Sequence, residues 1–380
     1  MKKRIAFAGA GFASVVLARE LAESGLFKIA VFEDRKHVAG NCHTSRENGI
    51  MVHHYGPHIF NTSRKDVWDY VNRFAEFGVY TNRVKAVTAK GVFSLPINLL
   101  TINQFFNKKF NPSEARAFVD TLGDKSIKEP QNFEEKALAI LGKDIYDAFF
   151  YGYTKKQWGV EPTQLPASIF QRLPVRFNYD DNYYRQTYQG IPLNGYTALI
   201  ENILDYKDIE VMTESSLDKK MINEFDHVFY SGQLDEFFSH SEGRLNYRTL
   251  RFERFDVSGD FQGNAVINYC EEQVPYTRIS EHKHFAPWEE HNSSIYFKEY
   301  SYLSGASDIP FYPMRLEPDK LVLEKYVRRA HSTKKVTFIG RLGTYRYLDM
   351  HVVIAESLDL AKTCMSLPLE EWPSFSVNPC

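Results

Sequence analysis

The chain of 380 residues has few cysteines, almost no net charge and no long apolar run. Its four cysteines are Cys42, Cys270, Cys364 and Cys380, and they form neither a CxxC pair nor a spacing typical of metal ligands. We therefore expect no disulfide framework and no metal site. Free thiols of this kind fit a reducing, cytoplasmic environment.

Charge and hydropathy argue against two further classes of partner. Lys and Arg number 46 and Asp and Glu number 48, so no basic surface for nucleic acid or for a membrane is expected. No run approaches the 18 apolar residues of a transmembrane helix, and the glycine-rich start lacks the apolar stretch of a signal peptide. An anionic ligand must therefore be held by a few local basic side chains.

Aromatic residues, by contrast, are abundant, with 29 Phe and 23 Tyr. Tyrosine offers a flat ring and a hydroxyl, which suits stacking on bases and lining sugar sites. Most of these rings are expected in a large core, and the length of the chain predicts two or three structural units.

The first 33 residues have the pattern of a β-α-β unit. Residues 4–8 predict a buried strand, 12–24 a helix and 29–33 a second strand, with a turn at Gly9 and Gly11. This pattern is typical of a parallel sheet covered by helices.

The turn carries a dinucleotide-binding fingerprint in which Gly9, Gly11, Phe12 and Ser14 take part. Ser14 replaces the third glycine, but it is small enough for the helix to pack on the strand. Glu33 ends the second strand, where its carboxylate can accept both hydroxyls of an adenosine ribose and would repel a 2′-phosphate. FAD or NAD is thus favoured over NADP; a glycine turn in an unrelated α/β fold is the alternative.

The end of the chain repeats this arrangement. Residues 335–340 predict a strand that ends at Gly340, and a helix is predicted from about Met350 to Met365. An extended FAD needs such a remote segment to hold its flavin end, so FAD is favoured over NAD.

Between these ends the pattern changes twice. Helical patterns dominate residues 98–171, and β-rich patterns dominate 179–312, within which 195–204 and 226–231 predict a helix and a strand of the nucleotide fold. The predicted class is α/β, with a discontinuous Rossmann-like FAD-binding domain, a helical insertion and an antiparallel sheet domain. The predicted boundaries are 1–80, 195–243 and 318–380 for the first, 97–178 for the second, and 81–96, 179–194 and 244–317 for the third.

Several segments together resemble one family, the bacterial UDP-galactopyranose mutases, and the resemblance runs end to end. The matching segments are GNCHT (40–44), YGPHIF (55–60), FSLPIN (93–98), GYTKKQWG (152–159), LPVRFNYDDNYY (173–184), YTRISEHKHF (276–285) and GRLGTYRYLD (340–349).

The resemblance implies a cytoplasmic, homodimeric isomerase that interconverts UDP-galactopyranose and UDP-galactofuranose for cell-surface polysaccharide, O antigen included. Reduced FAD does the covalent chemistry in that family: flavin N5 attacks the anomeric carbon, expels the diphosphate and forms an iminium adduct. A Ser-His-Asp or Cys-His signature is then not needed, and the chain shows none.

The resemblance also implies catalytic residues. Arg172 and Arg278 match two arginines that grip the diphosphate, and Arg172 lies in 166–177, the counterpart of a mobile lid. His58 matches a histidine beside the flavin, and Asp349 matches an active-site position. Without the motifs, ordinary surface arginines and a structural histidine would be the better interpretation.

Further positions are carried over as contacts. The nucleotide-sugar contacts expected are Asn61, Asn82, Phe149, Phe150, Tyr153, Thr154, Trp158, Tyr183, Asn268, Tyr312 and Tyr347. The cofactor contacts expected, besides the fingerprint, are Asp34, Gly40, Asn41, Gly340, Arg341, Asp349 and Met350. For at least one of Phe149 and Phe150 a place in the helical core is the alternative.

Two departures from the family pattern leave the sugar open. Asn61 stands where a second histidine is usual, and Phe311 stands where a tyrosine is common. A dTDP-linked 6-deoxy sugar such as dTDP-fucopyranose, or UDP-N-acetylgalactosamine, remains an alternative substrate. A flavin amine oxidase and a non-catalytic nucleotide-sugar binding protein are the alternative functions.

Histidines raise one more question. His282 and His284 are predicted on one strand face, and His53 and His54 lie near His58 in the sequence. No carboxylate or cysteine cluster accompanies them, so no metal is expected.

Overall fold

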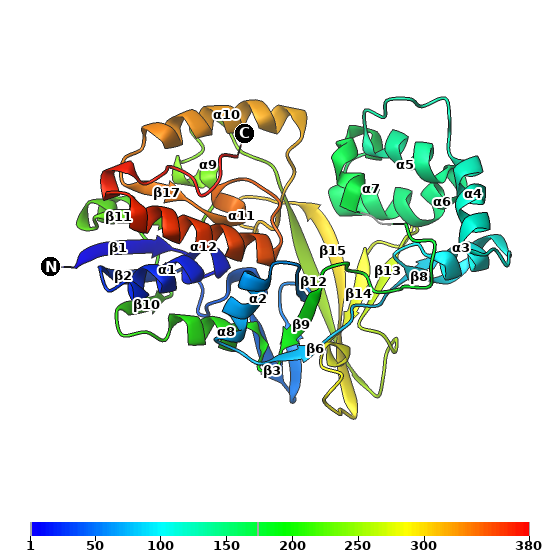
Figure 1. Ribbon diagram of the computed structural model, residues 1–380, viewed down its shortest axis with the longest axis horizontal. Coiled ribbons are helices and arrows are strands. Elements are labelled where there is room, and N and C mark those ends of the chain that lie inside the picture. Colours follow the sequence, from blue (N-terminus) through cyan, green and yellow to red (C-terminus); the bar gives the residue numbers. More distant parts are fainter. Residues whose placement is uncertain (1, 173–174, 380) are drawn as a thin grey trace.

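Three structural units lie side by side (Figure 1): a helix-covered parallel sheet, a long mixed sheet, and a helical unit on the far side of that sheet. The computed structural model describes residues 2–172 and 175–379, without the side chains of residues 171 and 172. Within those residues no helix is both long and apolar enough to cross a membrane.

The parallel sheet has the strand order β10-β2-β1-β11-β17. Its strands are β1 (Lys3–Ala8), β2 (Phe27–Glu33), β10 (Ile209–Thr213), β11 (His227–Tyr230) and β17 (Val336–Phe338), and all pairs are parallel. The order steps outward from β1 in both directions, as in a Rossmann fold. The predicted strands at 4–8, 29–33, 226–231 and 335–340 are confirmed.

Helices cover both faces of this sheet. On one face α1 (Phe12–Glu23) packs against α8 (Gly195–Leu204) and α12 (Met350–Ser366), all three predicted. On the other face α10 (Glu317–Ser332) and α9 (Leu234–Phe237) close a second core. Phe7 belongs to the first core and its neighbour Ala6 to the second, because successive side chains of a strand point to opposite faces.

The long sheet has the order β16-β12-β15-β14-β13-β7-β8. Every pair is antiparallel except β13 with β7, so the predicted antiparallel sheet contains one parallel pair. Its strands are β7 (Val84–Thr88), β8 (Gly91–Leu95), β12 (Tyr247–Ser258), β13 (Val266–Tyr269), β14 (Arg278–Glu281), β15 (Ser293–Leu303) and β16 (Tyr312–Pro313).

Small elements join the two sheets. A hairpin pairs β3 (Thr44–Glu47) with β4 (Ile50–His53), and a three-stranded sheet has the order β5-β9-β6. The members of that sheet are β5 (Phe60–Thr62), β6 (Phe77–Val79) and β9 (Tyr188–Pro192), and α2 (Lys65–Asn72) lies beside β5.

The helical unit comprises α3 (Leu99–Phe106), α4 (Pro112–Leu122), α5 (Phe133–Leu141), α6 (Lys143–Ile145) and α7 (Gly152–Trp158). Asn98, Asn111 and Asn132 cap α3, α4 and α5 by accepting backbone N–H groups, which explains where these helices begin. The predicted helical stretch 143–159 is divided, because residues 146–151 form a π-helical turn between α6 and α7. The residue boundaries of the three predicted domains stay a prediction.

Candidate active site

A cavity of about 640 Å³ opens where the three units meet. It is lined by residues of α7 and the π-helical turn, of the long sheet, of the loop before β5 and of the start of α12. Sixteen residues predicted as contacts line it: Asn41, His58, Asn61, Phe149, Phe150, Tyr153, Thr154, Trp158, Tyr183, Asn268, Arg278, Tyr312, Arg341, Tyr347, Asp349 and Met350.

Some predicted residues lie elsewhere. Asn82 is buried and is not part of the cavity wall; its carbonyl accepts the backbone N–H of Tyr183 at 2.8 Å, so it supports a wall residue from behind. The side chain of Arg172, at the end of a short 3-10 helix, lies outside the described residues. The fingerprint residues form a separate group at the carboxyl ends of β1 and β2.

That group forms a cradle at the start of α1. Gly9 has φ +98°, a conformation that suits glycine, and its N–H donates to the carbonyl of Phe32 at 2.7 Å. Gly11 caps the helix with ordinary dihedrals, and a Cβ there would meet no protein atom within 4 Å. This open space faces the helix N-terminus, where backbone N–H groups favour a phosphate.

Glu33 and its neighbours border the cradle. The Glu33 carboxylate is buried and accepts the backbone N–H groups of Ala10 at 2.8 Å and Arg35 at 3.0 Å. Each carboxylate oxygen keeps a second lone pair for a ribose hydroxyl. Asp34 is exposed and accepts a hydrogen bond from Ser216, and a Cβ on Gly40 would lie 3.6 Å from the Cα of Gly11, an ordinary contact.

The two ends of the chain meet at this cradle. Ser14 is fully buried, and its hydroxyl lies 3.3 Å from that of Ser231 at the end of β11, which is the close packing expected of the third fingerprint position. A Cβ on Gly340 would lie 2.9 Å from the Cβ of Ala13. The second strand–glycine–helix junction therefore lies against the first.

One arginine of the cavity wall, Arg278, is held by a buried carboxylate. Arg278 faces Glu299 across β14 and β15, and its Nε donates to Glu299 Oε2 at 2.7 Å. Burial alone would lower the pKa of Arg278, but the Glu299 carboxylate raises it well above its usual value. The Nη atoms make no hydrogen bond with the described residues, so a charged two-donor fork faces the cavity.

Tyrosines surround that fork. Burial raises the pKa of Tyr153, Tyr183 and Tyr312, so their phenols stay neutral donors. Tyr312 stacks on Tyr347 with ring centroids 5.4 Å apart, and the guanidinium of Arg341 lies within 5.4 Å of both rings. A neutral phenol can donate one hydrogen bond to a phosphate oxygen without adding charge.

His58 enters the cavity with a defined tautomer. Its Nδ1 lies 2.8 Å from the carbonyl of Gly56, and since a carbonyl can only accept, Nδ1 carries the proton. Burial, with the nearby guanidinium of Arg341, lowers the pKa of His58 to about 4. The ring is therefore neutral at pH 7, with a lone pair on Nε2.

The helical unit supplies the opposite wall through α7. Tyr153, Thr154 and Trp158 line the cavity. Lys156 anchors the helix, because its Nζ lies 2.7–3.0 Å from four carbonyl oxygens that share its three N–H donors, those of Tyr269, Glu271, Val274 and Tyr276. Phe149 and Phe150 belong to the apolar core of the unit and only border the cavity. These two residues are thus core residues that also line the cavity.

The cavity also contains residues that the sequence did not single out. Tyr55, Gln157, Tyr184 and Gln186 line it, as do Leu95–Ile97 of a segment that matched the family without an assigned role. Tyr55 and Tyr184 could have been found in the sequence, because each lies close to a residue that was predicted. No sequence signal paired Glu299 with Arg278, because the register of two strands brings them together.

The histidine prediction is partly wrong. β14 ends at Glu281, and residues 282–285 form a 3-10 turn, so His282 and His284 do not share a strand face. The turn brings His284 to Asp260 and Glu281, a carboxylate pair that no spacing in the sequence predicts. Both carboxylates already have protein partners: Lys283 contacts Asp260 at 2.9 Å, and Glu281 accepts three backbone N–H groups.

Comparisons with known proteins agree with this geometry. A family model for UDP-galactopyranose mutase matches residues 148–347, and one for an NAD(P)-binding Rossmann-like domain matches residues 8–74. The chain is 54% identical to a probable UDP-galactopyranose mutase of Klebsiella pneumoniae, covering 99% of this chain and 98% of that protein. It is 47% identical to a dTDP-fucopyranose mutase of Escherichia coli, covering 94% and 97%.

The fold is also that of a solved structure. A crystal structure of reduced UDP-galactopyranose mutase superposes with a TM-score of 0.72 at 15% identity, covering 100% of this chain and 97% of that one. The relative from Klebsiella pneumoniae matches this chain over nearly its whole length, and the family model matches more than half of it. Both matches agree with the cavity and the cradle described above. The chain therefore belongs to the UDP-galactopyranose mutase family of isomerases.

Proposed function

We propose that the protein interconverts UDP-galactopyranose and UDP-galactofuranose with reduced FAD bound, for cell-surface polysaccharide such as O antigen. The observation that carries the proposal is the Arg278 fork, held by buried Glu299 and ringed by neutral tyrosines in a cavity that reaches the start of α12. A departing diphosphate gains negative charge, and a fixed guanidinium stabilises that charge without reorganising.

The residues at the cradle fit FAD. The open Gly11 position and the N-terminus of α1 suit a pyrophosphate, and Glu33 suits the adenosine ribose. Asn41, Arg341 and Met350 border the cavity on the side of the cradle and would hold the flavin end. When bound, reduced FAD supplies the nucleophilic N5 that displaces the nucleotide from the anomeric carbon.

The chain's own residues bind, orient and stabilise. Tyr153 and Trp158 offer flat faces for the base, and Tyr183, Tyr312 and Tyr347 offer hydroxyls for the phosphates. His58 offers a neutral acceptor at Nε2 beside the flavin position. Arg172 keeps its proposed place as the second diphosphate-binding arginine, and we expect Arg172→Ala to lower kcat about 10²–10³-fold.

A second candidate substrate is dTDP-fucopyranose, and a third is UDP-N-acetylgalactosamine. A relative with 47% identity carries the name dTDP-fucopyranose mutase, and Asn61 and Phe311, which depart from the family pattern, both line the cavity. The Asn61 amide donates to the carbonyl of Ile59 at 3.1 Å, so its oxygen remains to accept from a sugar hydroxyl. A 6-deoxy sugar would present a methyl group instead of a hydroxyl to such a wall.

Two other functions fit less well. A flavin amine oxidase of similar fold would not need a diphosphate-binding fork, and a non-catalytic binding protein would form no furanose. The cytoplasmic location and the homodimer are carried over from the family as part of the proposal.

A substrate panel tests the assignment. Purified protein reduced with dithionite is offered the UDP-galactose, dTDP-fucose and UDP-N-acetylgalactosamine pairs, and products are separated by chromatography. We expect the largest kcat/KM for UDP-galactofuranose. A larger value for dTDP-fucofuranose would assign the second candidate, and turnover of no nucleotide sugar would refute the proposal.

A further inference from the structure

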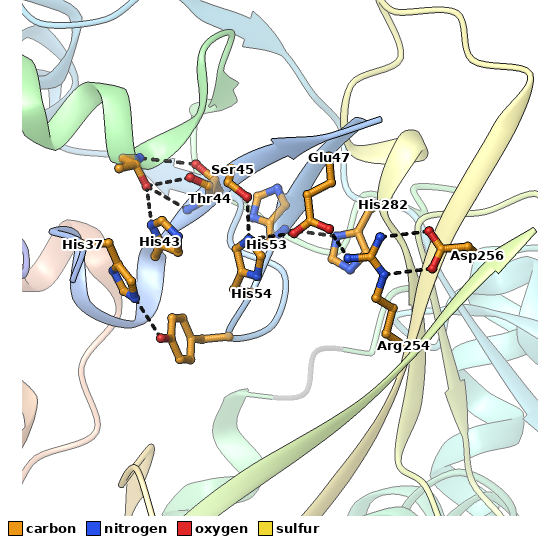
Figure 2. Close-up of polar contacts among 12 residues, drawn as sticks. His37, His43, Thr44, Ser45, Glu47, His53, His54, Arg254, Asp256 and His282 are labelled. Atoms are coloured by element: carbon orange, nitrogen blue, oxygen red, sulfur yellow. Dashed lines mark hydrogen bonds and ion pairs between the residues drawn. The ribbon is translucent and has the colours of Figure 1, made fainter. Parts of the chain in front are cut away.

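Two fully buried histidines lie behind the cavity. His53 ends β4, and His282 opens the 3-10 turn after β14 (Figure 2). Their rings are 1% and 0% exposed and lie nearly parallel, with centroids 6.1 Å apart. Neither ring lines the cavity, so neither can contact a substrate there.

Each ring accepts a backbone N–H group through Nδ1. The N–H of His53 donates to His282 Nδ1 at 3.2 Å, and the N–H of His58 donates to His53 Nδ1 at 3.4 Å. A backbone N–H can only donate, so both Nδ1 atoms are unprotonated and both rings carry their proton on Nε2. Burial favours the same neutral form, since it lowers the pKa of His282 to about 3.

Both rings incur a stability cost for this arrangement. The Nε2 atoms of His53 and His282 are buried and have no hydrogen-bond partner among the described residues. Their surroundings are aromatic: Tyr196 and Phe285 flank His53, and Phe285 and Phe297 flank His282. Because an apolar residue of similar size would avoid this cost, the histidines are better explained by what their Nδ1 atoms hold.

What they hold is the loop that presents His58. Residues 54–58 turn back after β4, and His58 is fixed twice, by its backbone N–H on His53 and by its ring Nδ1 on the carbonyl of Gly56. The first contact fixes the backbone of His58 and the second fixes its ring, which lines the cavity.

We propose that His282 and His53 form a positioning relay that fixes the backbone of the loop carrying His58 and so keeps the His58 ring on the Gly56 carbonyl. His282 Nδ1 accepts the backbone N–H of His53 and so orients that backbone, and His53 Nδ1 accepts the backbone N–H of His58 in the same way. The inference rests on the proposed function of the cavity, because His58 matters only if it meets the reacting groups.

A pair of substitutions at His53 separates the relay from simple packing. His53→Leu keeps the volume and removes the acceptor, whereas His53→Asn places an amide oxygen near the position of Nδ1. We expect His53→Leu to lower kcat by about ten-fold with KM nearly unchanged, and His53→Asn to recover most of that loss. The matched control is His227→Leu, which removes another buried histidine, in β11 and outside the cavity wall, and should leave kcat per folded molecule unchanged.

A double-mutant cycle tests whether His53 acts through His58. In a His58→Ala background, His53→Leu should lower kcat by less than two-fold, because the residue it positions is gone. An undiminished ten-fold loss in that background, or an asparagine variant as slow as the leucine variant, would overturn the relay.

A measurement that does not depend on catalysis distinguishes failure of the relay from failure of the proposed function. In protein with ¹⁵N-labelled histidine, the His58 ring, assigned with His58→Gln, should show a protonated Nδ1 and an unprotonated Nε2. In His53→Leu the loop is released, so the contact of His58 Nδ1 with the Gly56 carbonyl should loosen and the two tautomers should mix. Unchanged His58 nitrogen shifts in His53→Leu would refute the relay even in an active enzyme, whereas an inactive wild type with the predicted shifts would refute only the mutase assignment.

Discussion

Arg278 and Glu299 are opposite partners in one strand pair, and their geometry explains why an arginine is needed. One edge of the guanidinium is taken by the carboxylate through Nε, and the other edge faces the cavity. A lysine ammonium is a point donor that cannot hold the carboxylate and a phosphate in the same plane. The residue thus combines an anchor with a binding fork.

We therefore expect Arg278→Lys to lower kcat by at least ~10-fold and Arg278→Ala by about 10²–10³-fold. Steady-state kinetics with reduced enzyme measures both. Arg251→Lys, on an exposed site of β12 against the ring of Tyr300, is the matched control and should stay within about two-fold of the wild type. Near-normal kcat in Arg278→Lys would contradict the fork.

Single residues were predictable where a motif named them. Arg278, Tyr347 and His58 stand in matched segments, and the cavity contains all three. Asn82 was expected to contact the sugar but lies behind Tyr183, because sequence position does not tell which side of a loop faces a cavity. Glu299 could not be found at all, since only the register of β14 and β15 makes it a partner of Arg278.

Among the elements, α7 reaches the cavity through an unusually close approach to the long sheet. A Cβ on Gly152 would lie 2.4 Å from the carbonyl oxygen of Cys270, just after β13, and 2.8 Å from the backbone nitrogen of Glu272. Both contacts are with backbone, which cannot rotate away as a side chain can. The absent side chain lets Tyr153 and Trp158 stand beside the sheet.

A Gly→Ala substitution inside a helix ordinarily stabilises the folded protein by about 0.5–1 kcal/mol. At position 152 the steric overlap with the backbone outweighs this gain, so Gly152→Ala should lower the free energy of unfolding by about 1–3 kcal/mol. Urea unfolding of flavin-free protein measures it. Gly11→Ala is the control, since its Cβ would meet open space in the protein and its unfolding free energy should change by less than about 0.5 kcal/mol. A stabilised Gly152→Ala variant would contradict the packing of α7.

Elements with a clear period were predicted well. β1, α1 and β2 follow from alternating and helical apolar patterns with glycine between them. The parallel pairing of β13 with β7 and the π-helical turn at residues 146–151 were not predicted, because the first joins segments about 180 residues apart and the second has no distinct period.

The whole molecule carries several histidines that stay neutral when folded. Burial lowers the pKa of His227 and His282 to about 3 and that of His53 well below 6.5. The unfolded chain binds these protons near pH 6.5 and the folded chain does not, so their contribution is complete above pH 6.5 and is lost as the pH falls toward 3.

Between pH 7 and 5.5 each of these three histidines should lower the free energy of unfolding by about 1 kcal/mol, or about 3 kcal/mol together. Urea midpoints at the two pH values measure the fall. His227→Asn should reduce the fall by about 1 kcal/mol, and a protein equally stable at both pH values would contradict the neutral, buried state.

The order of the units along the chain was predictable, because the two strand–glycine–helix junctions stand at its ends and a helical stretch interrupts it. The residues of the cavity were predictable only through the family resemblance, since its walls come from segments that only the fold brings together.

The account's central claim is that this cavity turns over a nucleotide sugar only when its flavin is reduced. The most direct measurement compares the rate of UDP-galactopyranose formation from UDP-galactofuranose by one preparation, fully oxidised and after dithionite. The account predicts yellow protein that is nearly idle when oxidised and active when reduced, with no net consumption of reductant. Equal rates in the two states, or turnover by protein freed of flavin, would contradict it.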